Sequence, residues 1–217
     1  MDIERRTPEN TAVVLIDHVT GFANTFRSQT IPENVTGAVA LAKTALGYGV
    51  PLVVSAGPEQ DPRGPLYPQL TAVLGDHPVV HRAGSFGSFD AFDFPGFEEA
   101  VARTGRRHLA IAGLATEGCV LFTVLGALRR GYQVSLVVDA TAGETPVIHD
   151  AAVSRMTSLG VTPTSWLSFA TELQRDYDRV ETVQTYFELL ALSPVFGNNL
   201  SATLAAQAVG AAQAAAT

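Results

Sequence analysis

Cysteine, lysine and charge are scarce in this 217-residue chain, which has one cysteine (Cys119), one lysine (Lys43) and 16% charged residues. A single cysteine excludes a disulfide scaffold. The balance of 14 basic and 21 acidic residues, without a basic cluster larger than an arginine pair, argues against nucleic acid and anionic membranes as partners. The sequence has no apolar run near the roughly 18 residues of a membrane span and no N-terminal signal core. We therefore expect a cytoplasmic protein.

The low charge also bears on assembly, because an average soluble protein has about 25% charged residues. A surface with so little charge is expected to be partly buried against other subunits, which predicts a homo-oligomer. The length fits one domain spanning 1–217, since the chain contains no linker and no internal repeat.

Apolar, β-branched runs alternate with segments of helical periodicity along most of the chain. Such alternation predicts an α/β fold: a doubly wound, mainly parallel six-stranded sheet with helices on both faces. Runs that are continuously apolar indicate strands covered on both sides. The expected strands are 11–17, 50–56, 78–81, 108–113, 133–140 and 161–166, and the expected helices are 32–47, 66–74, 97–104, 117–130 and 146–159.

The pattern changes after a core of about 11–166. A mostly helical arm at about 168–192 carries the apolar residues Val180, Val183, Phe187 and Leu190, and we expect it to pack on the sheet layer of its own subunit or on a neighbour. The tail at 201–217 is rich in alanine and favours a helix, but it suggests no chemistry.

Chemically active residues follow three of the predicted strands, and in a doubly wound sheet the site lies at the carboxyl ends of the strands. Asp17 and His18 follow the first strand, Arg82 the third, and Cys119 the fourth. Cys119 is expected about two residues into a helix, where the helix dipole and Arg82 would lower the thiol pKa from about 8.5 to roughly 3.5–7.5. This predicts a nucleophile, although a lone cysteine can also be a small buried hydrophobe.

The neighbours of Cys119 are open to two interpretations each. Asp17 is a candidate proton acceptor for the thiol, or a loop cap. Arg82 keeps its proton, so it is an electrostatic partner of Asp17 and the thiolate, or part of a surface ion pair. His18 orients substrate, or satisfies a loop carbonyl. Aromatic side chains near the strand ends are candidates for a substrate pocket, and about half of them are expected in the core instead: Phe22, Phe26, Phe86, Phe89, Phe122 and Trp166.

The segments GLATEGCV and VSLVVDATAG, together with Asp17, resemble the isochorismatase-like cysteine hydrolase superfamily. The resemblance covers about 11–166, and VLIDHVTGF, HRAGSFGSFDAFD and SWLSFATELQRDY are most similar to its YcaC-like hydrolases. It implies that Asp17 takes the thiol proton of Cys119. It also implies an oxyanion hole of backbone amides at Ala115, Thr116 and Cys119, with a cis peptide between Ala115 and Thr116.

The chain departs from the superfamily in its cation, because its only lysine, Lys43, falls inside the first predicted helix. Arg82 is the candidate replacement. The nicotinamidase branch has a metal site of Asp and His, but the corresponding loop 55–68 contains no histidine, so we expect no metal and no cofactor. Glu59 and Asp61 in this loop are expected to hold a cation only weakly. YcaC-like relatives form large symmetric assemblies, which implies a tetramer or an octamer.

The leading hypothesis is a cofactor-free cysteine hydrolase of the amidohydrolase type, in which Cys119 attacks a small amide or a related C–N bond and forms a thioester acyl-enzyme. One alternative is a vinyl-ether hydrolase of the isochorismatase type, in which the aspartate acts as an acid. The other is a catalytically silent oligomeric binding protein of the same fold.

Overall fold

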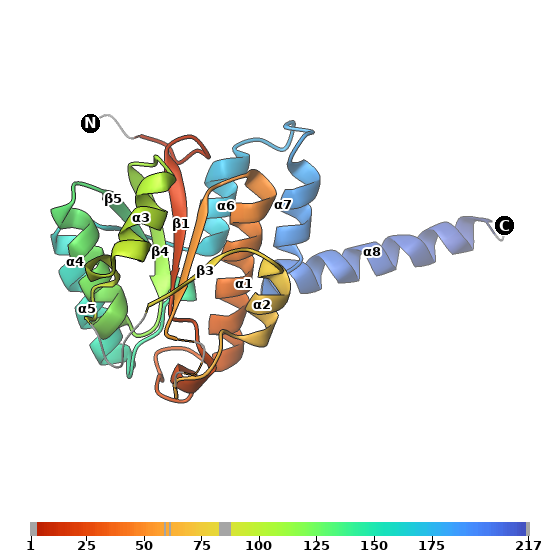
Figure 1. Cartoon of the computed structure of the whole chain (residues 1–217). Helices are drawn as coiled ribbons and strands as arrows, with labels where there is room; N and C mark the ends of the chain where they lie inside the picture. The colour runs from red at the N-terminus through yellow and green to blue at the C-terminus, as the bar shows by residue number, and fades with distance from the viewer. Residues whose placement is uncertain (1–3, 59, 61, 83–87, 216–217) are drawn as a thin grey trace.

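A six-stranded, all-parallel sheet forms the centre of the molecule (Figure 1). The computed structural model describes residues 4–58, 60, 62–82 and 88–215. The strand order β3-β2-β1-β4-β5-β6 is that of a doubly wound sheet, as the sequence predicted. The strands are β1 (Thr11–Ile16), β2 (Leu52–Ala56), β3 (Val79–His81), β4 (His108–Gly113), β5 (Gln133–Val137) and β6 (Thr162–Thr164).

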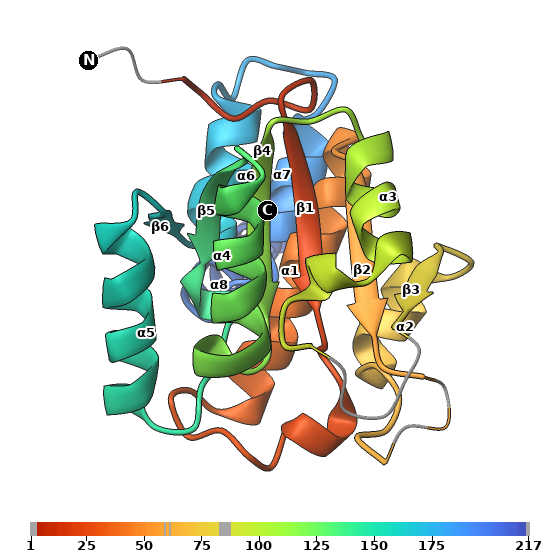
Figure 2. The ribbon, with the colours of Figure 1, turned by 60° about the vertical axis from the view of Figure 1, so that its left-hand side comes forward.

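Helices cover both faces of the sheet, and Figure 2 shows α3, α4 and α5 in front of it with α1, α6 and α7 behind. The helices are α1 (Ile31–Tyr48), α2 (Pro68–Leu74), α3 (Pro95–Arg103), α4 (Leu121–Arg129), α5 (Pro146–Ser158), α6 (Trp166–Gln174), α7 (Val183–Leu190) and α8 (Pro194–Ala215). Because the central strands are apolar on both sides, their alternate residues enter two separate cores. Val13 and Leu15 pack toward α1 and α6, whereas Val14 and Ile16 pack toward α3 and α4.

Helix α1 illustrates how local sequence sets an element boundary. The Thr30 side chain accepts a hydrogen bond from the Glu33 N–H, and the Glu33 carboxylate accepts one from the Thr30 N–H. This reciprocal cap satisfies two otherwise unpaired backbone donors. The helix ends at Gly49, whose left-handed backbone (φ 67°) suits a residue without a side chain.

The C-terminal arm differs from the sequence prediction in detail. It consists of two helices, α6 and α7, and α7 buries Tyr186 and Leu189 against the body. Of the predicted apolar stripe, Val180 and Phe187 are exposed instead. The reason is that α7 begins only at Val183, so its inward face falls on different residues. The alanine-rich tail belongs to α8, which leaves the body and extends alone (Figure 1).

No single helix among the described residues is long and apolar enough to cross a membrane. Two consecutive helical segments, Val183–Leu190 and Pro194–Val209, together have the length and apolar composition of a membrane span, but the chain bends by 105° between them.

Candidate active site

The structure brings Asp17, Arg82 and Cys119 together at the carboxyl edge of the sheet. Asp17 follows β1, Arg82 follows β3, and Cys119 lies in the turn after β4. Strands β1 and β4 are adjacent, but the chain leaves them in opposite directions along the sheet. Their carboxyl ends therefore flank the point where parallel α/β sheets bind ligands, at the lower edge of the sheet in Figure 2.

Asp17 has an unusual backbone and a fully buried carboxylate. Its φ of 52° is left-handed, a conformation that costs a non-glycine residue about 1–3 kcal/mol and that clusters at functional sites. The side chain is 1% exposed, and its Oδ2 forms an ion pair with the Arg82 guanidinium. Asp17 Oδ1 is buried and has no hydrogen-bond partner among the described residues. One carboxylate oxygen is thus neutralised and the other is left to accept a proton or a hydrogen bond.

Arg82 is held by its backbone and by an aromatic ring. Its N–H donates to the Ala56 carbonyl at the end of β2, which directs the side chain along the sheet edge. The guanidinium carbon lies 5.5 Å from the centroid of the Phe94 ring, a cation–π arrangement. Arg82 is buried and its partner is Asp17, so the surface ion pair considered from the sequence is wrong.

Cys119 does not lie inside a regular helix, contrary to the prediction. It belongs to a wide turn, Thr116–Val120, and α4 begins only at Leu121. The cause is Gly118, whose backbone (φ −108°, ψ −111°) is not helical. The turn is closed by the Val120 N–H, which donates to the Ala115 carbonyl at 3.1 Å.

The pKa of the Cys119 thiol shifts in the opposite direction to the one expected from the sequence. Burial raises it most, the Asp17 carboxylate raises it further, and Arg82 lowers it, so that it reaches about 11. The Asp17 carboxylate and the Arg82 guanidinium are both close enough to the thiol to act on its pKa. Near neutral pH the site therefore holds one cation, one carboxylate and one protonated thiol, with a net charge of zero.

The raised pKa gives a direct prediction for the resting protein. Because the thiolate is the reactive form and appears only as the pH rises toward about 11, the rate of Cys119 alkylation by iodoacetamide should keep increasing above pH 9. The measurement is the rate of adduct formation against pH by mass spectrometry, with Cys119→Ala as the blank. A rate that levels off below about pH 8.5, the free-thiol value, would contradict this prediction.

The backbone of the turn corrects two details of the expected oxyanion hole. The cis peptide joins Leu114 to Ala115 rather than Ala115 to Thr116, one bond earlier in the chain than the resemblance implied. The Thr116 N–H donates to the Ala142 carbonyl at 2.9 Å, so it is not free to bind an oxyanion. Ala115 and Cys119 remain the proposed donors.

A second layer of residues that the sequence analysis missed holds this turn in place. The Thr116 hydroxyl hydrogen-bonds with His149 Nδ1 at 2.8 Å, and Glu117 Oε1 accepts from the Glu144 N–H at 3.1 Å. A Cβ atom on Gly143 would collide with the Glu117 carboxylate and lie 3.3 Å from the Cβ atoms of Thr116 and His149. Gly143 and Glu144 could have been selected from the sequence, because they follow β5, the next strand along the same edge of the sheet.

His18 takes the second of its two sequence-based roles. Its Nε2–H donates to the Ala140 carbonyl at 2.9 Å, which ties the end of β1 to the segment after β5. Burial is the main cause that lowers its pKa to about 4, so the ring is neutral. Its Nδ1 is buried and has no partner among the described residues.

The predicted pocket aromatics separate into three groups. Phe89 and Phe122 are exposed, with ring centroids 5.9 Å apart and planes tilted by 33°. Phe89 reaches the turn, since its ring lies 4.0 Å from a Cβ placed on Gly118. Phe22, Phe26 and Trp166 pack on the opposite face of the sheet from Cys119, and Trp166 lines a separate pocket with Pro32 and Pro194. Phe86 lies outside the described residues. Trp166 was misassigned because it opens α6 rather than ending β6.

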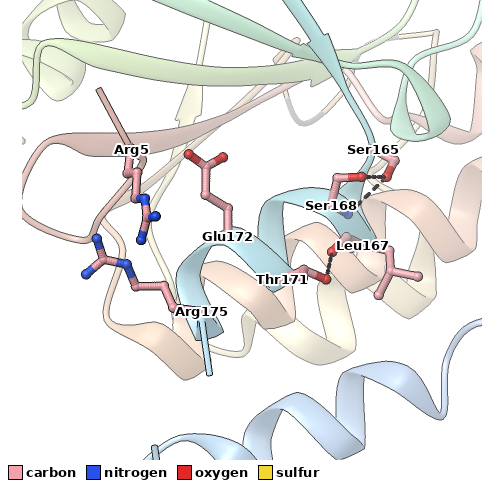
Figure 3. Close-up of a pocket in the computed structure, with 7 residues that line it drawn as sticks. All are labelled: Arg5, Ser165, Leu167, Ser168, Thr171, Glu172 and Arg175. Carbon is pink, nitrogen blue, oxygen red and sulfur yellow. Dashed lines mark hydrogen bonds between the residues drawn. The ribbon is translucent and has the colours of Figure 1, made fainter. Parts of the chain in front are cut away.

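A larger surface pocket lies along α6, away from these residues (Figure 3). Its volume is about 610 Å³, and its lining includes Arg5, Glu172 and Arg175 but no thiol and no predicted site residue. Among the described residues there is no group of three or more His, Cys, Asp or Glu side chains placed to hold a metal ion. Glu59 and Asp61, the weak cation candidates, lie outside the described residues.

Comparisons with known proteins agree with this arrangement. A family model described as an isochorismatase domain matches residues 11–168. The probable hydrolase YcaC of Escherichia coli is 32% identical over 184 residues, which cover 84% of this chain and 87% of YcaC. Two solved structures each cover 94% of this chain and 98% of their own, with TM-scores of 0.85. One is YcaC from Pseudomonas aeruginosa with hexane-2,5-diol and covalent acrylamide (31% identity), and the other is E. coli YcaC, an octameric hydrolase of unknown specificity (29% identity).

Proposed function

Because the chain belongs to the isochorismatase family, whose YcaC relatives are hydrolases, we propose that it hydrolyses the C–N bond of small neutral amides through a thioester on Cys119. The observation that carries this proposal is that Cys119 lies beside the buried ion pair of Asp17 and Arg82, and that both charges act on its thiol. A nucleophile, a proton acceptor and a fixed cation share one buried site, which is the composition that covalent acyl transfer requires.

In the first half-reaction the thiol proton moves to Asp17 as sulfur attacks the amide carbonyl carbon. The site contains one proton for two acidic groups beside one cation, so this transfer moves negative charge from oxygen to sulfur without changing the net charge. The backbone N–H groups of Ala115 and Cys119 stabilise the oxyanion. Collapse of the tetrahedral intermediate breaks the C–N bond, and the leaving amine takes the proton from Asp17.

In the second half-reaction Asp17 removes a proton from water, and the resulting hydroxide attacks the thioester. The C–S bond breaks, a carboxylic acid is released, and the proton on Asp17 returns to the Cys119 sulfur. Arg82 keeps its proton throughout and stabilises whichever group is anionic. None of these steps needs a cofactor.

Neutral substrates are favoured because Arg82, the cation that the described part of the chain places beside Cys119, is already paired with Asp17. The exposed rings of Phe89 and Phe122 offer an apolar surface beside the turn. The P. aeruginosa relative with covalent acrylamide is an example of a small amide bound to a protein of this group.

The test is ammonia release from a panel of small primary amides, with Cys119→Ala as the inactive control and mass spectrometry to detect the acyl-enzyme. The proposal predicts release by the wild type, none by the variant, and an added acyl mass on the peptide that contains Cys119. A vinyl-ether hydrolase would give a Cys119→Ala variant that keeps its activity on vinyl ethers, and a silent binding protein would give no turnover of either class.

The proposed enzyme is a homo-oligomer. The octameric assembly of E. coli YcaC and the low charge of this chain support this, and a tetramer or an octamer is the expected size.

A further inference from the structure

Helix α8 is the part of the molecule with the least contact to the rest. It extends away from the α/β body, and residues 201–209 are all exposed (Figure 1). Its exposed side chains include Val195, Phe196, Leu204 and Val209. Apolar side chains of this size gain free energy when they leave water, so an extended, solvated α8 is unfavourable.

The composition of α8 makes this exposure more unusual. Glu188 is the last charged residue of the chain, so 189–217 contains no Asp, Glu, Lys, Arg or His. At about 100° per residue, Phe196, Leu200 and Leu204 fall within about 80° of one another, and Val195 and Val209 lie on the opposite side. A helix that is apolar on opposite sides is normally buried on both.

The body offers a partly apolar groove near the origin of α8. It has a volume of about 520 Å³ and runs between α1, α2 and α7, where Leu46, Ala72, Val73 and Leu189 line it together with the polar residues Lys43, Thr185 and Glu188. Leu46 is an exposed leucine. None of the described lining residues belongs to α8, and α8 points away from its own body. The α8 of another copy is therefore better placed to cover this groove than the chain's own helix.

We propose that α8 is an exchange arm, which docks on the groove between α1, α2 and α7 of a second copy of this chain while the second copy returns its own α8. This inference rests on the homo-oligomer proposed above and assigns its interface. Reciprocal exchange follows from two-fold symmetry, in which the same two surfaces meet twice. One apolar side of α8 would face the partner's body and the other side the partner's α8.

The area of such an exchange is sufficient for a stable contact. The 22 residues of α8 give a length of about 33 Å at 1.5 Å per residue. One half of the surface of a helix about 10 Å across and of that length is about 500 Å². Each subunit would bury its own arm and the surface under its partner's arm, about 1,000 Å², which exceeds the about 800 Å² per partner of a standard interface.

The test is light scattering of the full-length protein over a range of micromolar concentrations, for the wild type and for Leu204→Glu. The wild type should have a mass that is a multiple of 22.9 kDa. Leu204→Glu should form a smaller assembly or raise the dissociation constant at least about tenfold, because a carboxylate would be buried without a partner. The matched control is Leu159→Glu, since Leu159 is 50% exposed and Leu204 56%, and it should behave as the wild type.

A crosslinker identifies the partner directly. With benzophenone placed at residue 204, a mixture of ¹⁴N- and ¹⁵N-labelled subunits should give adducts that join light and heavy chains at peptides containing 43–47 or 72–73. An oligomer that Leu204→Glu leaves unchanged would overturn the exchange arm while keeping the homo-oligomer. A wild-type monomer would overturn both, and co-flotation of that monomer with phosphatidylcholine vesicles would assign α8 to a lipid surface. None of these outcomes depends on amide turnover.

Discussion

Asp17→Asn is expected to lower amide turnover by about 10²–10⁴-fold, the usual contribution of a general base, while it makes Cys119 easier to alkylate at neutral pH. The two effects have one cause. In the proposed reaction the carboxylate accepts the thiol proton, and in the resting protein its negative charge also raises the pKa of the thiol. Asparagine removes both contributions and keeps nearly the same shape. The measurements are ammonia release and the rate of iodoacetamide addition at pH 7.

The matched control for this variant is Asp139→Asn. Asp139 is a partly buried aspartate at the same edge of the sheet, and its Oδ1 accepts a hydrogen bond from the Trp166 N–H, which asparagine can also accept. This variant should keep wild-type turnover and alkylation. If Asp17→Asn retains most of its turnover, or if its alkylation slows together with turnover, Asp17 is not the base.

Arg82→Met is expected to lower the free energy of unfolding by about 3–5 kcal/mol, the usual effect of removing one partner of a buried ion pair. Both side chains are almost completely buried, and the variant leaves the Asp17 carboxylate without its cation. Methionine fills a similar length without charge, so the loss reports the uncompensated carboxylate rather than a cavity. Urea unfolding monitored by circular dichroism gives the value.

Two further variants separate charge from packing. Arg82→Lys keeps the cation and should recover most of the stability. The double variant Asp17→Asn with Arg82→Met removes both charges and should be more stable than Arg82→Met alone. Equal stability of the single and double variants would show that the loss arises from packing against Phe94 instead.

The fold could be predicted almost completely from hydrophobic pattern, and the reasons are physical. The four central strands β2, β1, β4 and β5 are covered on both faces, so each appears as a largely apolar run that the flanking polar turns delimit. The edge strands β3 and β6 are shorter and partly exposed. The ends of β4, His108 and Gly113, were correct, whereas α4 was predicted to begin at residue 117, four residues before its observed start at Leu121. Gly118 interrupts the helical geometry there, and periodicity does not register a single residue of non-helical backbone.

The site was predictable as a set of residues but not as an electrostatic state. Strand-end position was enough to select Asp17, Arg82 and Cys119. The direction of the thiol pKa depended on how deeply Cys119 is buried and on its distance from Asp17, and neither is encoded in local sequence. Long-range contacts were missed for the same reason. Thr116 and His149 are 33 residues apart in the sequence. Arg82 and Phe94 are joined by a segment without periodicity, so their contact could not be predicted either.

The neutral trio at the sheet edge has a consequence for how substrates arrive. Since Asp17, Arg82 and Cys119 carry no net charge together, the electric field of the trio is weak at a distance, before or after the proposed internal proton transfer. For the uncharged amides proposed as substrates, capture then depends on diffusion and contact with apolar surface rather than on long-range steering. Added salt, which weakens the encounter of charged ligands with charged clefts, has little field to screen here.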